Sequence, residues 1–222
     1  MKKGTLSMPQ KLFPRLLLLL IGLIFFALGV SLGLQANIGY APWEVLHVGL
    51  AKTFGLSIGT ANILTGFFLV LYAAFSGENI GIGTIANMFL IGFFIDLILQ
   101  INLIPLASSL LPGLFMMIAS MFTIAFGTFF YISSGFGTGP RDSLMVILTR
   151  KTHLSIGFCR SAIETTAVVI GWYLGGMVGF GTLFSALAIG YCVQITFKLL
   201  RFDPTIIEHE RFQDTYHAFL RK

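Results

Sequence analysis

Long apolar runs separated by short polar segments dominate this chain. Six of the runs are long enough to cross a bilayer as a helix, which takes about 20 predominantly apolar residues. They are Leu16 to Leu34, Ile58 to Phe75, Ile85 to Ile101, Leu110 to Ile132, Ile156 to Leu174 and Phe180 to Leu200. Only ten acidic or basic residues occur between Leu16 and Phe197. The pattern predicts an all-α polytopic membrane protein with six transmembrane helices.

The two halves of the chain resemble each other after a shift of 98 residues. Gly29 to Leu97 aligns without a gap with Gly127 to Ile195, and 17 of the 69 aligned positions are identical. Chance would give roughly one identity in twelve for segments of this composition. We therefore expect two three-span membrane repeats, at 16–101 and 110–200, joined by a linker at 102–109. Cytoplasmic segments at 1–15 and 201–222 would flank them.

Composition agrees with a membrane protein. Hydrophobic residues make up 56% of the chain and charged residues 10%, whereas about a quarter of the residues of a soluble domain are charged. The net charge of +5 comes mostly from the N-terminus and the loop after the fourth span, so it indicates topology and no nucleic-acid partner. The two cysteines fall in predicted membrane helices and indicate no disulfide framework.

The positions of the basic residues predict the orientation of the repeats. Lys and Arg are enriched in cytoplasmic loops. Six spans place the N-terminal cluster, the group Arg141, Arg150 and Lys151, and the basic C-terminus on that side. Because each repeat has an odd number of spans, the second repeat would be inverted relative to the first. If 42–54 and 140–152 also crossed, the repeats would be parallel. The charge bias permits this alternative, but segments of thirteen residues are short for a span.

Each repeat carries the same motif directly after its first span. A glycine-rich approach is followed by a proline, one residue, an acid and an amphipathic run that ends in basic residues. Proline suits the first turn of a helix, and an acid there faces the positive end of the helix dipole. The first copy contains Gly39, Pro42 and Glu44, and the second contains Gly137, Gly139, Pro140 and Asp142. We expect two short helices.

Two placements of these motif helices remain open. They could lie flat at each interface, with Trp43 and Leu46 inserted and the charges in water. Alternatively, they are re-entrant helices that enter from opposite faces, with glycine-rich N-terminal turns that meet near mid-membrane. Interrupted helices of this kind commonly bind substrates or ions there.

Ionisable residues inside the spans are further candidates for a binding site. Glu164 lies near the centre of the fifth span, with Arg160 one helical turn earlier. Such charges are costly in lipid and by default functional, although a self-neutralising pair that holds the helix explains them equally well. Asp96 and its repeat equivalent Gln194 indicate a shared inward-facing position, or alternatively hydrogen bonding between helices.

The remaining polar features indicate less. His47 is expected at the interface, a tight turn is sufficient for the glycines at 81, 83, 179 and 181, and Pro204 to Leu220 could form a short amphipathic helix. His153 and the cysteines do not have metal-site spacing. No phosphate loop, nucleophile elbow or metal-protease signature occurs in the sequence. We therefore expect neither an enzyme nor a cofactor.

Both copies of the motif carry a family resemblance. The segment from Asn37 to His47, Ser57-Ile58-Gly59, and the segment from Gly137 to Met145 resemble the YczE/YitT-type group of bacterial integral membrane proteins. The resemblance covers nearly the whole chain. It implies a multi-span fold in the bacterial cytoplasmic membrane, with both termini cytoplasmic from the charge pattern, and it supplies no catalytic residue.

The sequence favours a small secondary transporter or permease for an unknown small molecule or ion. Glu44, Asp142 and Glu164 would handle substrate or protons between the repeats, with Arg160 as counter-charge and Asp96 as a further candidate. The alternative is an accessory membrane protein that supports another enzyme or exporter. Apart from the lipid bilayer, a homo-oligomer or a membrane partner remains open.

Overall fold

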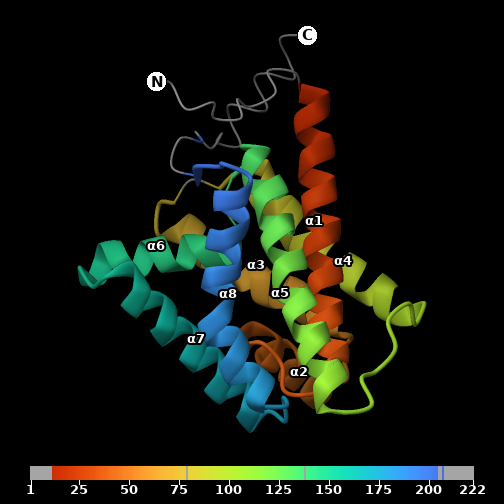
Figure 1. Ribbon diagram of the computed structural model, residues 1–222. Coiled ribbons are helices and arrows are strands. Elements are labelled where there is room, and N and C mark those ends of the chain that lie inside the picture. The colour runs from red at the N-terminus through yellow and green to blue at the C-terminus, as the bar shows by residue number, and fades with distance from the viewer. Residues whose placement is uncertain (1–11, 79, 138, 205–206, 208–222) are drawn as a thin grey trace.

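The computed structural model describes residues 12–78, 80–137, 139–204 and 207. These residues form eight α-helices, which Figure 1 shows from red to blue along the chain. The helices are α1 (Leu12–Gln35), α2 (Pro42–Phe54), α3 (Ile58–Phe75), α4 (Ile82–Gln100), α5 (Leu110–Ser133), α6 (Pro140–Thr152), α7 (Ile156–Tyr173) and α8 (Phe180–Leu199). The six expected spans correspond to α1, α3, α4, α5, α7 and α8, and the motif helices are α2 and α6.

The helix boundaries follow the same shift as the sequence. Adding 98 to both ends of α1, α2 and α3 gives the ends of α5, α6 and α7. Local signals explain this, because Ser57 and Ser155 cap the starts of α3 and α7 with side chains that accept the backbone N–H of Thr60 and Phe158. Pro42 and Pro140 likewise occupy the first turns of α2 and α6.

Within the described ranges, five helices are long and apolar enough to cross a membrane: α1, α3, α4, α5 and α8. α7 has the length of α3, but Arg160 and Glu164 lower its mean hydropathy. The polar pair that marks α7 as a candidate site therefore also sets it apart from the other long helices.

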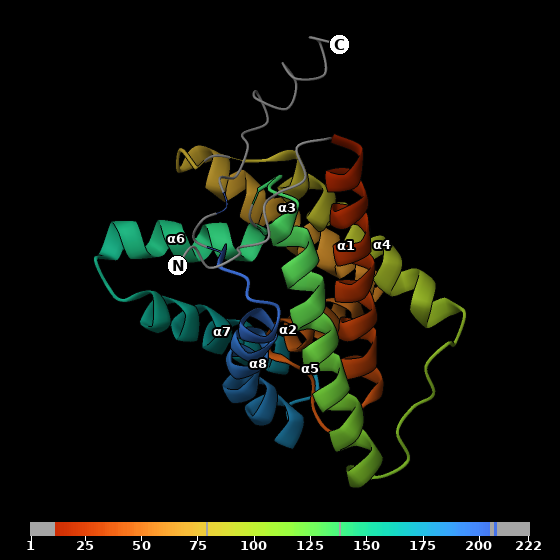
Figure 2. The same cartoon turned by 45° about the horizontal axis from the view of Figure 1, so that its top comes forward.

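α1 and α5 run antiparallel and form the central pair of the bundle, side by side in Figures 1 and 2. A side chain at Gly22 would meet the backbone of Gly127, and one at Gly29 would meet the backbone of Ser120. Small residues at these contacts let the helix backbones approach closely. Under the 98-residue shift, Gly22 is equivalent to Ser120 and Gly29 is equivalent to Gly127. The two contacts are therefore the same contact made once from each repeat, and the α1–α5 pair is symmetric.

Most other helix contacts also occur twice, once between two helices and once between their repeat equivalents. α2 packs on α7 as α6 packs on α3, and α1 packs on α4 as α5 packs on α8. One pair breaks the symmetry: α3 packs along α4, whereas its equivalents α7 and α8 make almost no contact. The two repeats therefore share their helices but differ in how their last two helices are arranged.

Tight packing and hydrogen bonds hold α3 to α4. A Cβ at Gly59 would overlap the backbone of Gly92. Asp96 on α4 accepts hydrogen bonds from the Ser57 hydroxyl and, at 2.7 Å, from the Gly59 N–H. The carboxylate therefore fastens the start of α3 to the second half of α4.

In the second repeat, the equivalent residues of α7 and α8 do not touch. Gly157 and Gly190 stand where the first repeat has Gly59 and Gly92, and a Cβ at either position would meet nothing within 4 Å. The residues that make the contact possible are thus present in both repeats, while the contact itself exists in one.

Candidate functional site

The loop before each motif helix docks on the other repeat. The Ile38 carbonyl accepts the N–H of Gly181 at the start of α8, at 2.7 Å. In the equivalent contact, the Phe136 carbonyl accepts the N–H of Gly83 at the start of α4, at 2.8 Å. A turn alone therefore does not account for these repeated glycines, since they also receive the opposite motif loop. This docking role has no signal in the sequence.

Gly39 and Gly137 make the docking sterically possible. Their φ values of +108° and +125° suit glycine. A side chain at Gly39 would overlap the backbone of Gly179, and one at Gly137 would press on Gly81 and Thr84. These two motif glycines thus place the starts of α2 and α6 inside the bundle.

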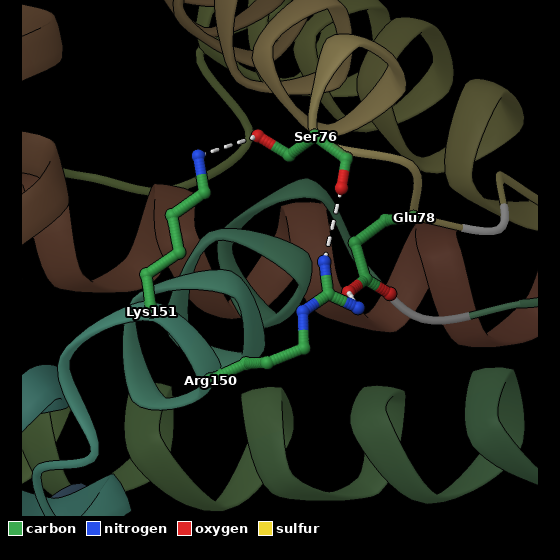
Figure 3. A network of polar contacts seen from close by, with 4 residues as sticks. All are labelled: Ser76, Glu78, Arg150 and Lys151. Atoms are coloured by element: carbon green, nitrogen blue, oxygen red, sulfur yellow. Dashed lines mark hydrogen bonds and ion pairs between the residues drawn. The ribbon is translucent and has the colours of Figure 1, made fainter.

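The opposite end of each motif helix is held by its basic residues. At the end of α6, Arg150 pairs with Glu78 at 2.7 Å and donates to the Ser76 carbonyl at 3.0 Å, while Lys151 donates to the Ser76 hydroxyl (Figure 3). At the end of α2, the repeat-equivalent Lys52 donates to the Gly175 carbonyl at 3.0 Å. Each motif helix is therefore fixed at both ends against the other repeat.

The N-terminal turns of α2 and α6 face one cavity of about 240 Å³, and all eight helices contribute to its lining. Trp43 and Glu44 enter it from α2, and Arg141 and Asp142 enter it from α6. Its apolar wall includes Phe26, Ile91, Met121, Ile124, Ile163 and Ile189. The cavity combines a charged region with a hydrophobic body, as small-molecule sites commonly do.

Two ion pairs lie in the charged region. Arg141 Nη2 lies 3.8 Å from Glu44 Oε1, and the guanidinium stacks over the Trp43 ring at 4.8 Å. Arg160 Nε donates to Glu164 Oε1 at 2.9 Å across one turn of α7. Both arginines thus have a carboxylate partner within the cavity lining.

Asp142 differs from the other two carboxylates. Its side chain is exposed, it lines the cavity, and no cation of the described chain lies within ion-pair distance of it. Arg141 and Arg160 act on its charge from further away. Asp142 is therefore the carboxylate best placed to meet a ligand.

Two buried polar atoms of the lining have no hydrogen-bond partner among the described residues. They are His47 Nδ1, on a side chain that is 1% exposed, and the Tyr131 hydroxyl, on one that is 3% exposed. Unpaired buried polar atoms are costly, so a bound ligand or water that faces them would lower the free energy of this site.

The structure unites most of the candidate residues. Glu44, Asp142, Arg160 and Glu164 line the same cavity, whereas Asp96 is outside its lining and joins α3 to α4. His47, which is expected at an interface, is buried and lines the same cavity. Burial of Glu44 at 6% exposure also disagrees with motif helices whose charges all lie in water.

Sequence reasoning also missed lining residues. Tyr131 has no functional signal in the sequence, since an aromatic residue at the end of a span usually serves packing. Arg141 is expected only as part of the cytoplasmic basic group, whereas the structure places it in the cavity lining. The expected amphipathic segment from Pro204 to Leu220 and the basic N-terminal cluster lie largely outside the described residues. Within the described ranges, no three His, Cys, Asp or Glu side chains are placed to hold a metal ion.

Residues 13–198 match the model of a family of unknown function, DUF6198. The chain belongs to this family. It is 35% identical over 191 residues to the uncharacterized membrane protein YczE of Bacillus subtilis (strain 168), covering 85% of this chain and 88% of YczE. It is 31% identical over 193 residues to the uncharacterized protein YyaS of the same organism, covering 85% of this chain and 92% of YyaS.

A further relative comes from another bacterium. An uncharacterized protein of Haemophilus influenzae (strain ATCC 51907 / DSM 11121 / KW20 / Rd) is 32% identical over 189 residues, covering 85% of this chain and 86% of its own. No solved structure matches the chain. The resemblance to the YczE type is confirmed. Together with the apolar helices, these relatives make this DUF6198 member a multi-pass integral membrane protein.

Proposed function

We propose that this DUF6198 protein is a small secondary transporter or permease rather than an enzyme, and that its solute binds in the central cavity. The observation that carries the proposal is the meeting of two helix N-termini, from different repeats, at one charged cavity. Interrupted helices at a repeat interface are the usual way in which secondary transporters build a solute site.

The proposal includes six spans arranged as two inverted three-span repeats. α7 is the sixth span, since Arg160 and Glu164 neutralise each other and lower the cost of placing them in lipid. The antiparallel pairing of α1 and α5, repeat equivalents of each other, supports inversion. In this arrangement α2 and α6 are re-entrant helices, and the Arg150 and Lys52 ends lie at opposite faces.

The orientation follows from the basic residues. With the termini and the Arg150 end of α6 on the cytoplasmic side, the single basic residue Lys52 of α2 lies on the outer side. The membrane in this proposal is the bacterial cytoplasmic membrane, where cytoplasmic loops are enriched in Lys and Arg.

Transport would use the asymmetry between the repeats. A solute site must open to each side in turn, and the α3–α4 pair is closed in this structure while the α7–α8 pair is open. If α3 separated from α4 while α7 closed on α8, the same cavity would open to the opposite side of the membrane. The sequence equivalence of the repeats makes both arrangements available to each pair. Identical Ser and Gly residues at the closing positions of both repeats support this exchange.

The test is efflux from proteoliposomes loaded with a bacterial small-molecule extract, with mass spectrometry of the released compounds. Wild-type protein should release at least one solute faster than empty liposomes, and Asp142→Asn combined with Glu164→Gln should abolish that difference. Glu78→Gln, an acid outside the cavity lining, is the matched control. If the double variant releases every compound as fast as wild type, the cavity is not the transport site.

A stable membrane partner in detergent pull-downs, together with no efflux above empty liposomes, would instead favour the accessory-protein alternative.

A further inference from the structure

A polar pit opens in the cavity at Gly139, the residue that precedes α6. A Cβ there would lie 3.4 Å from Asp142 Oδ2, 3.4 Å from the Tyr131 hydroxyl and 3.7 Å from Asn87 Nδ2. All four residues line the cavity. A carboxylate, a phenol and an amide thus converge on the side of Gly139 where other residues carry a methyl group, and the missing side chain leaves that face of the cavity open to a ligand.

Backbone conformation does not require glycine at this position. Gly139 has φ −67° and ψ 157°, which any residue adopts. The contacts that a methyl group would make are ordinary van der Waals distances. Neither strain nor close packing therefore explains the missing side chain, in contrast to Gly39 and Gly137.

The first repeat has no such pit. Ala41 stands at the position equivalent to Gly139 and already carries a methyl group, and Gly33 replaces Tyr131. Glu44, the equivalent of Asp142, is paired with Arg141. The pit is therefore a property of the second repeat and not a by-product of the duplication.

The free groups of the pit favour a cation over an anion. The described lining holds three carboxylates, Glu44, Asp142 and Glu164, and two arginines, so its formal charge of −1 favours a cation. Each arginine already has a carboxylate partner that offsets its charge. Asp142 has no cation within ion-pair distance in the described chain. The dipole of α6 stabilises its charge by only about 0.3–1 kcal/mol, which is small beside the cost of a charge at depth.

The hydrogen-bonding groups of the pit indicate which class of cation it would bind. The Tyr131 hydroxyl is buried and makes no hydrogen bond of standard geometry among the described residues, although the Gly139 N–H faces its oxygen. A hydroxyl oxygen has two lone pairs, so it can still accept a hydrogen bond from a ligand. A protonated amine can donate to it and to the Asp142 carboxylate together, while a quaternary ammonium has no N–H to donate. The apolar wall would receive the rest of the molecule.

We propose that the pit formed by Gly139, Asp142 and Tyr131 binds the ammonium group of a protonated primary or secondary amine, whose apolar body lies along the cavity wall. This inference rests on the proposed solute cavity and names the class of solute.

Trp43 offers a direct reporter of binding. The chain has two tryptophans, of which Trp43 lines the cavity and Trp172 is 66% exposed on α7. In a Trp172→Phe background, fluorescence therefore reports on the cavity alone. The probes are phenethylammonium, its trimethylated quaternary analogue, and 3-phenylpropionate, an anion of similar shape.

Phenethylammonium should change Trp43 fluorescence saturably and bind at least tenfold more tightly than either other probe. Asp142→Asn, and separately Gly139→Ala, should each weaken its binding at least tenfold, and Glu78→Gln should not. Gel filtration and circular dichroism confirm that each variant is folded.

Tighter binding of 3-phenylpropionate, unchanged phenethylammonium binding in both pit variants, or no response to any probe would overturn the amine assignment. The efflux experiment distinguishes a wrong amine assignment from a wrong transporter proposal. A solute released by wild type but not by the double variant keeps the transporter proposal, even where phenethylammonium does not bind.

Discussion

Three of the five charged residues of the cavity lining stand where the two repeats differ, whereas Glu44 and Asp142 are equivalent acids and many residues that shape the backbone are shared. Arg141, Arg160 and Glu164 in the second repeat occupy the positions of Trp43, Asn62 and Gly66 in the first. Shared glycines, prolines and capping serines build the same helices twice. At the scale of single residues, substitution after duplication therefore explains why the chemistry is concentrated in the second repeat.

Asp96 should be a structural residue and not a solute ligand. In Asp96→Ala, the hydrogen bonds from Ser57 and the Gly59 N–H are lost, and bonds to charged groups contribute about 1.5–3 kcal/mol. We expect the free energy of unfolding in mixed micelles to fall by about 2 kcal/mol. Asp96→Asn keeps an acceptor and should lose less. An alanine variant as stable as wild type would contradict this role.

The Arg150–Glu78 pair should contribute little to stability despite its short distance. Arg150 is half exposed, and exposed pairs are worth about 0.2–1 kcal/mol. A double-mutant cycle with Arg150→Met and Glu78→Gln should give a coupling energy in that range, which decreases in high salt. A coupling that is several times larger and insensitive to salt would mean that water is excluded from this end of α6.

At the scale of elements, the sequence predicted the helices well and their packing poorly. Apolar runs of spanning length and the Pro42 and Pro140 signals are local, so they appear in the sequence directly. The gap between α7 and α8 is not local, because Gly157 and Gly190 are the same residues that pack tightly in the first repeat. Because the two repeats carry the same glycines, their sequence does not reveal which pair of helices is packed and which is separated.

The site was predictable to the extent that its charges are conspicuous in an apolar chain. Glu44, Asp142 and Glu164 stand out for this reason. Tyr131 and Gly139 acquire their role only from neighbours distant in sequence, such as Asn87, which lies on the other repeat. The motif itself points to Gly139 and Asp142, while the contribution of Tyr131 and Asn87 to the pit has no signal in the sequence.

Repeat-equivalent glycines should respond differently to the same substitution. A methyl group at position 59 overlaps the Gly92 backbone, and overpacking of this kind costs about 1–3 kcal/mol. Gly157→Ala adds a methyl group in open space and should be neutral or slightly stabilising, since alanine is the better helix former. Unfolding in mixed micelles measures both. Equal losses in the two variants would contradict the asymmetry between the repeats.

At the scale of the whole molecule, one cavity lies between two pairs of helices that have the same closing residues and different arrangements. The proposed transport cycle requires the second pair to close as the first pair is closed here. Closure would bring Ser155 and Gln194 together, as Ser57 and Asp96 are now.

Disulfide formation in liposomes tests this closure most directly. Cys159 and Cys192, the only cysteines of the sequence, are first replaced by serine, and two cysteine pairs are compared under a mild oxidant. Ser57→Cys with Asp96→Cys should form a disulfide rapidly, because these side chains are already in contact. Ser155→Cys with Gln194→Cys should also form one, more slowly, as α7 approaches α8. If the second pair stays reduced while its thiols still react with maleimide, the two repeats do not alternate.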